Sequence, residues 1–245
     1  MKNFISITGS AYILLVCSVA QTLAMPVGNS MDSINYRYHA SDLSQWSAGV
    51  YLSPRERNIS HDLIQDYTLL SEDTITLYLA YDYKRWVSLY CSVAGGESST
   101  DGWESEGIYD IGAGLRLGLL DHDIMDPWLI EDRIRLTGYL QQTITGTKLA
   151  GKDVQWIETY ASLVLNIINE VTGNKSYLPH AIGVFIGPVF SDIQSRGLSN
   201  MSVNEQRQFG YTAGIEIFYT ERVSFELGLE NFGPSATKAG IHVRF

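Results

Sequence analysis

The sequence predicts an all-β fold, a single transmembrane antiparallel up-and-down β-barrel of about ten strands, with eight or twelve strands as near alternatives. Three observations predict it. Apolar and polar residues alternate with period two through most of the chain after residue 44. Long and short connections take turns between the alternating segments. The last strand, "KAGIHVRF", ends on the aromatic Phe245. In water, a strand with such an end would tend to aggregate through its exposed apolar face. In a membrane, that face contacts lipid instead.

The composition sets the class of protein and excludes others. The chain has 245 residues, 22 of them glycine and 15 tyrosine, and only 18% are charged, which fits one β-rich domain. Its net charge of −10, with no run rich in Lys or Arg, argues against a nucleic-acid partner.

The N-terminal residues look like a targeting segment. Residues 1–24 combine the positive Lys2, an apolar stretch and a small-residue exit, a pattern typical of a secretory signal peptide. A lipoprotein signal at Cys17 is the alternative, disfavoured by the bulky Val16. Residues 25–44 are then a short periplasmic lead, and residues 45–245 the barrel domain. Cys91 is the one cysteine left after cleavage, so no internal disulfide is expected.

Ten segments are predicted as strands. Many approach the roughly 9–11 residues that a tilted membrane strand needs, and the clearest, "VSFELGLEN", places Val223, Phe225, Leu227 and Leu229 on one face. No later stretch is apolar for long enough to form a membrane helix, so a membrane form has to be a closed barrel. The predicted strands are 45–53, 74–83, 86–94, 107–120, 128–144, 154–168, 177–190, 208–219, 222–231 and 237–245.

The connections between these strands support the barrel. Short turns are predicted on the periplasmic side, at 83–85, 121–127 and 220–221, with a longer one at 170–176. Longer loops are predicted on the outer side, at 53–73, 95–106, 145–153 and 193–208, with a shorter one at 232–237. This alternation is typical of outer-membrane barrels.

Aromatic residues are predicted to form two girdles at the membrane interfaces. The periplasmic girdle comprises Trp46, Trp86, Trp128, Tyr219 and Phe245. The outer girdle comprises Trp156, Tyr211 and Phe232. The alternative is that aromatic residues simply favour strands.

The signal peptide, the hairpin "TLYLAYDYKRWVSLYCSVAG" and above all the last strand resemble the small outer-membrane β-barrel proteins of bacteria, of the OmpA, OmpX and OmpW type. Lys238, Gly240, Val243 and Phe245 are similar to the C-terminal assembly signal of these proteins, although Val243 stands where an aromatic is often found. The resemblance implies insertion into the outer membrane by the barrel-assembly machinery. It implies no ligand.

If the apolar face of each strand meets lipid, the other face points into the barrel. The interior would then hold acids and arginines in near balance, which favours mutual pairing over a pore, since a selective pore usually carries a ring of one sign. We therefore expect a lumen filled by an ion-pair network. Its predicted members are Asp110, Arg116, Arg133, Arg135, Glu158, Glu216, Glu226, Glu230 and Arg244, with Tyr160 and His242 also facing inward.

These features predict a non-enzymatic outer-membrane protein with a structural or surface-interaction role through its outer loops. The expected partners are membrane lipid and lipopolysaccharide, and no cofactor or metal is expected. A narrow pore for small solutes and a hydrolase at the barrel rim remain alternatives. Acidic residues of the outer loops, such as Glu72 and Glu104, could bind Ca²⁺ or Mg²⁺, but a solvated acidic loop is the simpler interpretation.

Overall fold

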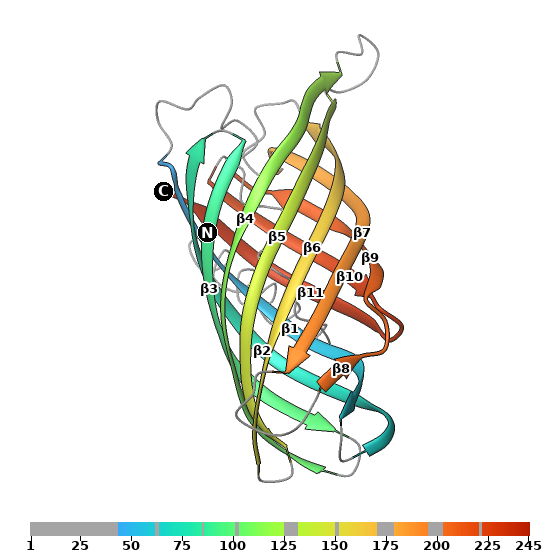
Figure 1. Cartoon of the computed structure of the whole chain (residues 1–245). Helices are drawn as coiled ribbons and strands as arrows, with labels where there is room; N and C mark the ends of the chain where they lie inside the picture. The colour runs from blue at the N-terminus through green and yellow to red at the C-terminus, as the bar shows by residue number, and fades with distance from the viewer. Residues whose placement is uncertain are drawn as a thin grey trace, which may run out of the picture.

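The computed structural model describes residues 44–61, 64–84, 86–100, 103–124, 132–149, 152–170, 179–195, 203–220 and 222–245. Ten strands form a closed antiparallel barrel, seen from the side in Figure 1. The strands are β1 (Trp46–His61), β2 (Ile64–Lys84), β3 (Val87–Thr100), β4 (Trp103–Ile124), β5 (Asp132–Leu149), β6 (Lys152–Glu170), β7 (Ala181–Ser195), β9 (Phe209–Phe218), β10 (Val223–Asn231) and β11 (Ser235–Arg244). The fold class and strand number predicted from the sequence are confirmed. The predicted signal peptide and most of the predicted lead, residues 1–43, lie outside the described residues.

Each strand pairs with its neighbour along the chain, and β11 pairs with β1 to close the barrel. An eleventh strand, β8 (Val203–Glu205), was not predicted. It pairs with the end of β1 in the connection between β7 and β9. We call the end of the barrel that carries Ser44 and Phe245 the terminal end, and the opposite end, where β1 turns into β2, the far end.

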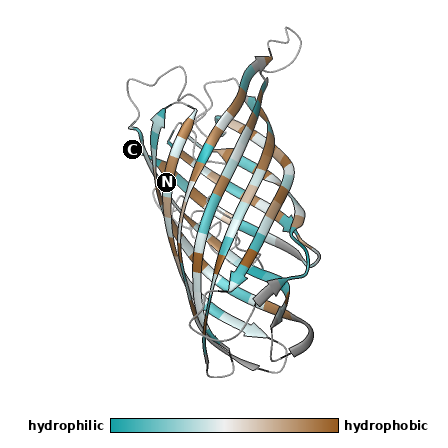
Figure 2. Ribbon diagram, in the orientation of Figure 1, coloured by the Kyte–Doolittle hydropathy of each residue, from teal (hydrophilic) through white to brown (hydrophobic). Residues whose placement is uncertain are grey.

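The wall of the barrel has its polarity inside out relative to a soluble protein. Exposed large apolar residues stand on the outer face of all ten barrel strands, for example Leu77 and Leu79 on β2 and Leu163, Leu165 and Ile167 on β6. The inner face carries most of the buried charged residues, and Figure 2 shows the resulting alternation along the ribbons. Lipid makes an apolar exterior favourable, because it has no hydrogen bonds to lose. No helix among the described residues is long and apolar enough to span a membrane.

The strands differ in length, and several exceed their predicted bounds at the far end. β9, β10 and β11 have 10, 9 and 10 residues, close to the number that a tilted strand needs to cross a membrane. β2 and β4 are about twice as long, with 21 and 22 residues. Residues 53–61 and 64–73, predicted as the first outer loop, are the far halves of β1 and β2, paired in register from Ser53–Thr74 up to Ile59–Thr68. The far halves of β1 to β7 thus extend the wall beyond the apolar belt.

Closure between the first and last strands is short. β1 pairs with β11 over Ser47–Leu52 and with β8 over Ile59–His61. The main-chain N–H of Phe245 donates to the carbonyl of Trp46 and that of Gln206 to the carbonyl of Asn58, so even-numbered residues of β1 turn their backbone groups toward this edge. Pro54 is among them and has no N–H to donate, which gives a physical reason for the β1–β11 ladder to stop before it.

The predicted girdles are partly wrong. At the terminal end Trp46, Trp86, Tyr219 and Phe245 are exposed on the outer face, as predicted. Trp128 lies outside the described residues. At the other level Tyr211 is exposed, but Trp156 is 1% exposed and packs inside the barrel against Ile59, Leu70, Ile108, Val154 and Ile193. Phe232 is also buried.

Candidate functional site

The candidate site is the polar interior of the barrel. Seven basic and seven acidic residues of the described chain are buried there. They are Arg55, Arg57, Arg116, Arg133, Arg135, Lys238 and Arg244, with Glu72, Asp82, Asp110, Glu158, Glu216, Glu226 and Glu230. An isolated buried charge is costly, so such a set requires pairing. All nine predicted members of the ion-pair network are in it. They do not form one network, but fall into groups at three levels.

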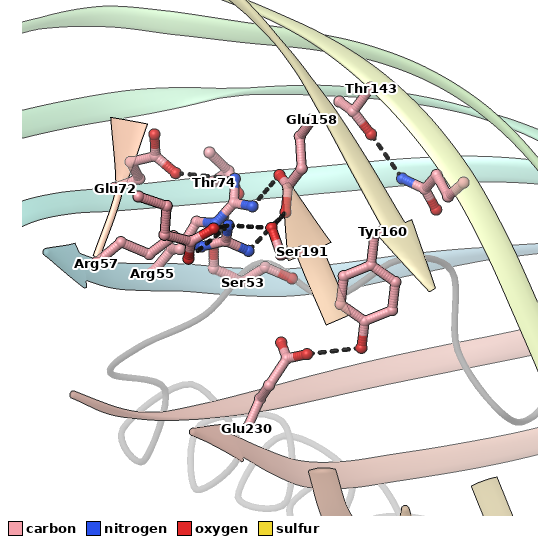
Figure 3. A network of polar contacts seen from close by, with 12 residues as sticks. Ser53, Arg55, Arg57, Glu72, Thr74, Thr143, Glu158, Tyr160, Ser191 and Glu230 are labelled. Atoms are coloured by element: carbon pink, nitrogen blue, oxygen red, sulfur yellow. Dashed lines mark hydrogen bonds and ion pairs between the residues drawn. The ribbon is translucent and has the colours of Figure 1, made fainter. Parts of the chain in front are cut away.

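The far cluster consists of Arg55, Arg57, Glu72, Glu158 and Glu205. Arg55 forms ion pairs with Glu158 and, at 3.3 Å, with Glu72. The Arg57 guanidinium donates to Glu158 Oε1 at 2.6 Å and lies 3.1 Å from Glu205 Oε1. Figure 3 shows both guanidinium groups converging on the Glu158 carboxylate. Glu158 therefore joins the two arginines of β1 to β6 on the opposite wall.

Hydroxyl groups complete the far cluster. Ser191 Oγ accepts from Arg57 at 2.7 Å and donates to Glu158 Oε1 at 2.9 Å. Slightly nearer the terminal end, the Tyr160 hydroxyl donates to Glu230 Oε1 at 2.6 Å. These charge-assisted bonds link β1, β6, β7 and β10 across the lumen.

The acids outnumber the bases at this level. Asp110 interacts electrostatically with Arg55, and Glu230 with Arg57, in addition to the three carboxylates of the far cluster. Burial raises the pKa of the Glu205 carboxyl on β8, and the nearby Arg57 guanidinium opposes the shift only in part.

The central cluster is formed by Glu226, Lys238, His242 and Tyr78. Glu226 forms an ion pair with Lys238, and its Oε2 lies 3.5 Å from His242 Nε2. The other ring nitrogen of His242 is 2.8 Å from the Tyr78 hydroxyl. Lys238 also lies over the Tyr51 ring, 5.5 Å from its centroid. Together with Tyr90, Tyr139 and Phe185, the tyrosines form an aromatic layer across the middle of the lumen.

A carboxylate, a histidine and a hydroxyl in a row resemble the relay of a hydrolase. Here all three side chains are buried, and the hydroxyl belongs to a tyrosine within the aromatic layer. A substrate would have to displace that layer to reach it. The row therefore fits a structural hydrogen-bond chain better than a catalytic one.

The terminal cluster is centred on Asp82. Its Oδ2 pairs with Arg244 at 2.7 Å, and its Oδ1 accepts a hydrogen bond from Ser88 and lies 4.0 Å from Arg116. Arg116 donates to Ser88 Oγ at 2.9 Å. A second group pairs Arg133 and Arg135 with the half-exposed Asp121, at 3.6 and 3.9 Å.

Sequence reasoning missed four buried ionic residues and misjudged a fifth. Arg55, Arg57 and Glu72 lay in the predicted outer loop, and Asp82 close to a predicted turn. Lys238 was considered only as part of the assembly signal, yet it is buried and paired with Glu226. The alternation of Ser53, Arg55, Arg57 and Ile59 was the signal that could have revealed them, because residues two apart share one face of a strand. Of the other signal residues, Gly240 packs against the Tyr51 ring, and Val243 and Phe245 are exposed outside.

Within the described residues, no group of three or more His, Cys, Asp or Glu side chains is arranged to hold an ion. The predicted loop residue Glu72 is instead paired with Arg55. The side chain of Glu104 lies outside the described set.

Comparison with known proteins does not identify a family for this chain. No protein-family model matches the chain, and no curated protein sequence matches it. Among solved structures, the chain is similar to Neisserial surface protein A, with 13% identity, a TM-score of 0.39 and coverage of 82% of this chain and 98% of that one. It is also similar to an outer membrane channel from Pseudomonas putida F1, with 10% identity, a TM-score of 0.43 and coverage of 90% and 100%. A third likeness is to the transport unit of the autotransporter AIDA-I from Escherichia coli, with 12% identity, a TM-score of 0.38 and coverage of 90% and 92%.

Proposed function

We propose that the protein is an integral protein of the bacterial outer membrane whose lumen is closed and which acts, without catalysis, through its far end. The observation that carries this proposal is the filling of the lumen. Seven basic and seven acidic side chains are buried in it, ion pairs form at three levels, and an aromatic layer crosses its middle. Barrels of this size have interiors that side chains can fill, whereas aqueous channels occur in much larger ones.

The exterior supports the membrane location. The apolar belt and the exposed aromatic residues at the terminal end match the outward surface of a membrane barrel. The proposed partners are outer-membrane lipid, lipopolysaccharide and the barrel-assembly machinery, which would recognise the last strand ending at Phe245.

The shape of the far end supports this proposed role. The far halves of β1 to β7 extend the wall beyond the apolar belt and are cross-linked inside by the far cluster. A rigid, charged projection is suited to contact envelope components or other surfaces. It is less suited to serve as a lid over a channel, because a lid has to move.

The test has two parts. The full chain is expressed in a Gram-negative host, and its place is found by membrane fractionation and by heat-modifiable migration on gels. The purified protein is then added to planar lipid bilayers. We expect outer-membrane location and no steady conductance. A steady, selective conductance of the wild type would refute the closed lumen and support the narrow pore instead.

A further inference from the structure

The connection between β7 and β9 forms a strap across a gap in the barrel wall. We use "strap" for residues 203–208, which include β8. Because β9, β10 and β11 are short, the wall between the far halves of β7 and β1 lacks three strands. The strap spans this gap. At one side β8 pairs with β1 at Ile59–His61, and the N–H of Gln206 donates to Asn58 O at 3.1 Å. At the other side the N–H of Ser191 on β7 donates to Gln208 O at 2.8 Å.

The described side chains of the strap make polar contacts with both sides of the gap. The Gln208 amide donates to Asp192 Oδ1 at 2.8 Å on the exposed side. On the lumen side Glu205 forms an ion pair with Arg57 at 3.1 Å. Only three residue pairs join β8 to β1, whereas β2 pairs with β1 along nearly its whole length. The strap is thus joined to β1 over a much shorter length than β2 is.

Behind the strap, on the lumen side, lies Arg57, the ion-pair partner of Glu205. Its guanidinium lies 4.9 Å from the centroid of the Phe232 ring, in the turn between β10 and β11, and also binds Glu158 and Ser191. Phe232 is buried, so Arg57 has an apolar support on one side and carboxylates on the other. An anion replacing Glu205 would meet a guanidinium already held in place.

In front of the gap, the outer wall carries an aromatic strip. Phe190 and Phe209 are paired in register, with ring centroids 5.1 Å apart. Phe209 is 74% exposed and Tyr211, two residues along β9, is 50% exposed. The polar side chains of Asp192 and Gln208 stand directly beyond the strip. Exposed aromatic rings at the boundary between an apolar belt and a polar rim mark the membrane interface.

We propose that the strap covers a lateral binding site for an anionic amphiphile of the outer leaflet. The acyl chain lies on the aromatic strip of Phe190, Phe209 and Tyr211, and the phosphate headgroup binds Arg57 in place of Glu205 when the strap lifts. Charge complementarity selects the headgroup, because Glu205 already fills this position with an anion. The site rests on the membrane location proposed above and adds to it a ligand class and a route of entry.

A disulfide lock tests the strap. Asn58→Cys and Gln206→Cys are combined in a Cys91→Ser background, since the main chains of these two residues are hydrogen-bonded and Cys91 is otherwise a free exposed thiol. The full-length protein is purified in detergent, and bound phosphatidylglycerol is counted by native mass spectrometry, with phosphatidylcholine of the same chains for comparison. We expect the oxidised form to lose phosphatidylglycerol binding and the reduced form to regain it.

Single substitutions test the headgroup contact. Arg57→Gln is expected to weaken phosphatidylglycerol binding at least about tenfold, the usual loss for one charge-assisted hydrogen bond. Glu205→Gln is expected to strengthen it, because the competing anion is removed. Glu56→Gln is the matched control, since this residue lies on β1 next to Arg57 but faces outward, and it should bind like wild type.

The outcomes separate the possible explanations. Equal binding by the oxidised and reduced lock, or unchanged binding by Arg57→Gln, would overturn the proposal. Equal retention of phosphatidylcholine and phosphatidylglycerol would show that the aromatic strip alone binds the acyl chains. It would overturn the proposal that Arg57 selects an anionic headgroup. Full competition by inorganic phosphate would point to a site for free phosphate and overturn the amphiphile. A chain missing from the outer-membrane fraction would refute the proposed location instead, so the membrane fraction is checked first.

Discussion

Replacing Glu226 by alanine is expected to destabilise the barrel by about 3 kcal/mol. The side chains of Glu226 and Lys238 are fully buried and form an ion pair, and His242 lies 3.5 Å from the same carboxylate. Removing one member of a buried ion pair leaves the other charge buried without its partner, which typically costs about 3–5 kcal/mol. We choose the lower end for two reasons. Lys238 keeps its contacts with the rings of Tyr51 and Phe185, and Glu216, directly opposite Glu226 on β9, loses a like-charged neighbour.

The reasoning is tested by a double-mutant cycle with Lys238→Met. The double variant has no stranded charge, so it should be less destabilised than the sum of the two single variants by more than about 1 kcal/mol. The free energy of unfolding is measured by urea titration in lipid vesicles, followed by tryptophan fluorescence. Additive effects of the two substitutions would refute the claim that the pair is energetically coupled. An unchanged midpoint in the Glu226 variant, together with steady conductance of the wild type, would refute the filled lumen.

Three further changes have defined expectations. Trp156→Ala should lower the free energy of unfolding by about 3–5 kcal/mol in the same titration, because it leaves a cavity in an apolar cluster inside the barrel. Trp86→Ala, on the outer face, is the control and should cost clearly less. Equal losses would mean that Trp156 is not packed as described. Phe245→Ala should lower the amount of protein in the outer membrane. The free energy of unfolding of the refolded protein should stay nearly unchanged, because the main-chain hydrogen bonds of this residue remain. Normal membrane levels of this variant would refute the assembly signal. Gly187→Ala should destabilise by about 1–3 kcal/mol, since a methyl group there would overlap a carbonyl of β6, while Gly118→Ala, where the added carbon finds ordinary contacts, should be near neutral in the same assay.

The barrel itself could be predicted from the sequence because its signal is repeated. Each strand alone is ambiguous, but ten alternating segments with alternating connections leave few other folds. The far halves of β1 and β2 were missed for a physical reason. Arg55, Glu56 and Arg57 look like loop residues, because charged residues are rare in strands with one face in a core. Beyond the apolar belt both faces of a strand can be polar, so composition no longer separates strand from loop.

The interior could be predicted as a set but not as an arrangement. Alternation places Glu158 and Glu226 inside, and the structure agrees. Their partners Arg55 and Lys238 come from strands far away in the sequence, at levels set by the tilt and stagger of the closed barrel. A single sequence contains no measure of that stagger. Trp156 shows the same limit, because its depth in the barrel, rather than its residue type, decides whether it meets lipid or packs in the lumen.

The short ladder between β1 and β11 has a consequence for how the chain folds. Ser47 pairs with Arg244, so closure joins residues from the two ends of the described chain. The chain therefore loses the conformational entropy of a very long loop before any other contact between β1 and β11 forms. Hairpins between consecutive strands need no such search. Closure is therefore expected to be the last step of folding. The amide hydrogens of Ala48, Val50 and Leu52, which face β11, should exchange with solvent earlier than those of β5 and β6, whose ladder runs from Asp132–Asn169 to Leu149–Lys152.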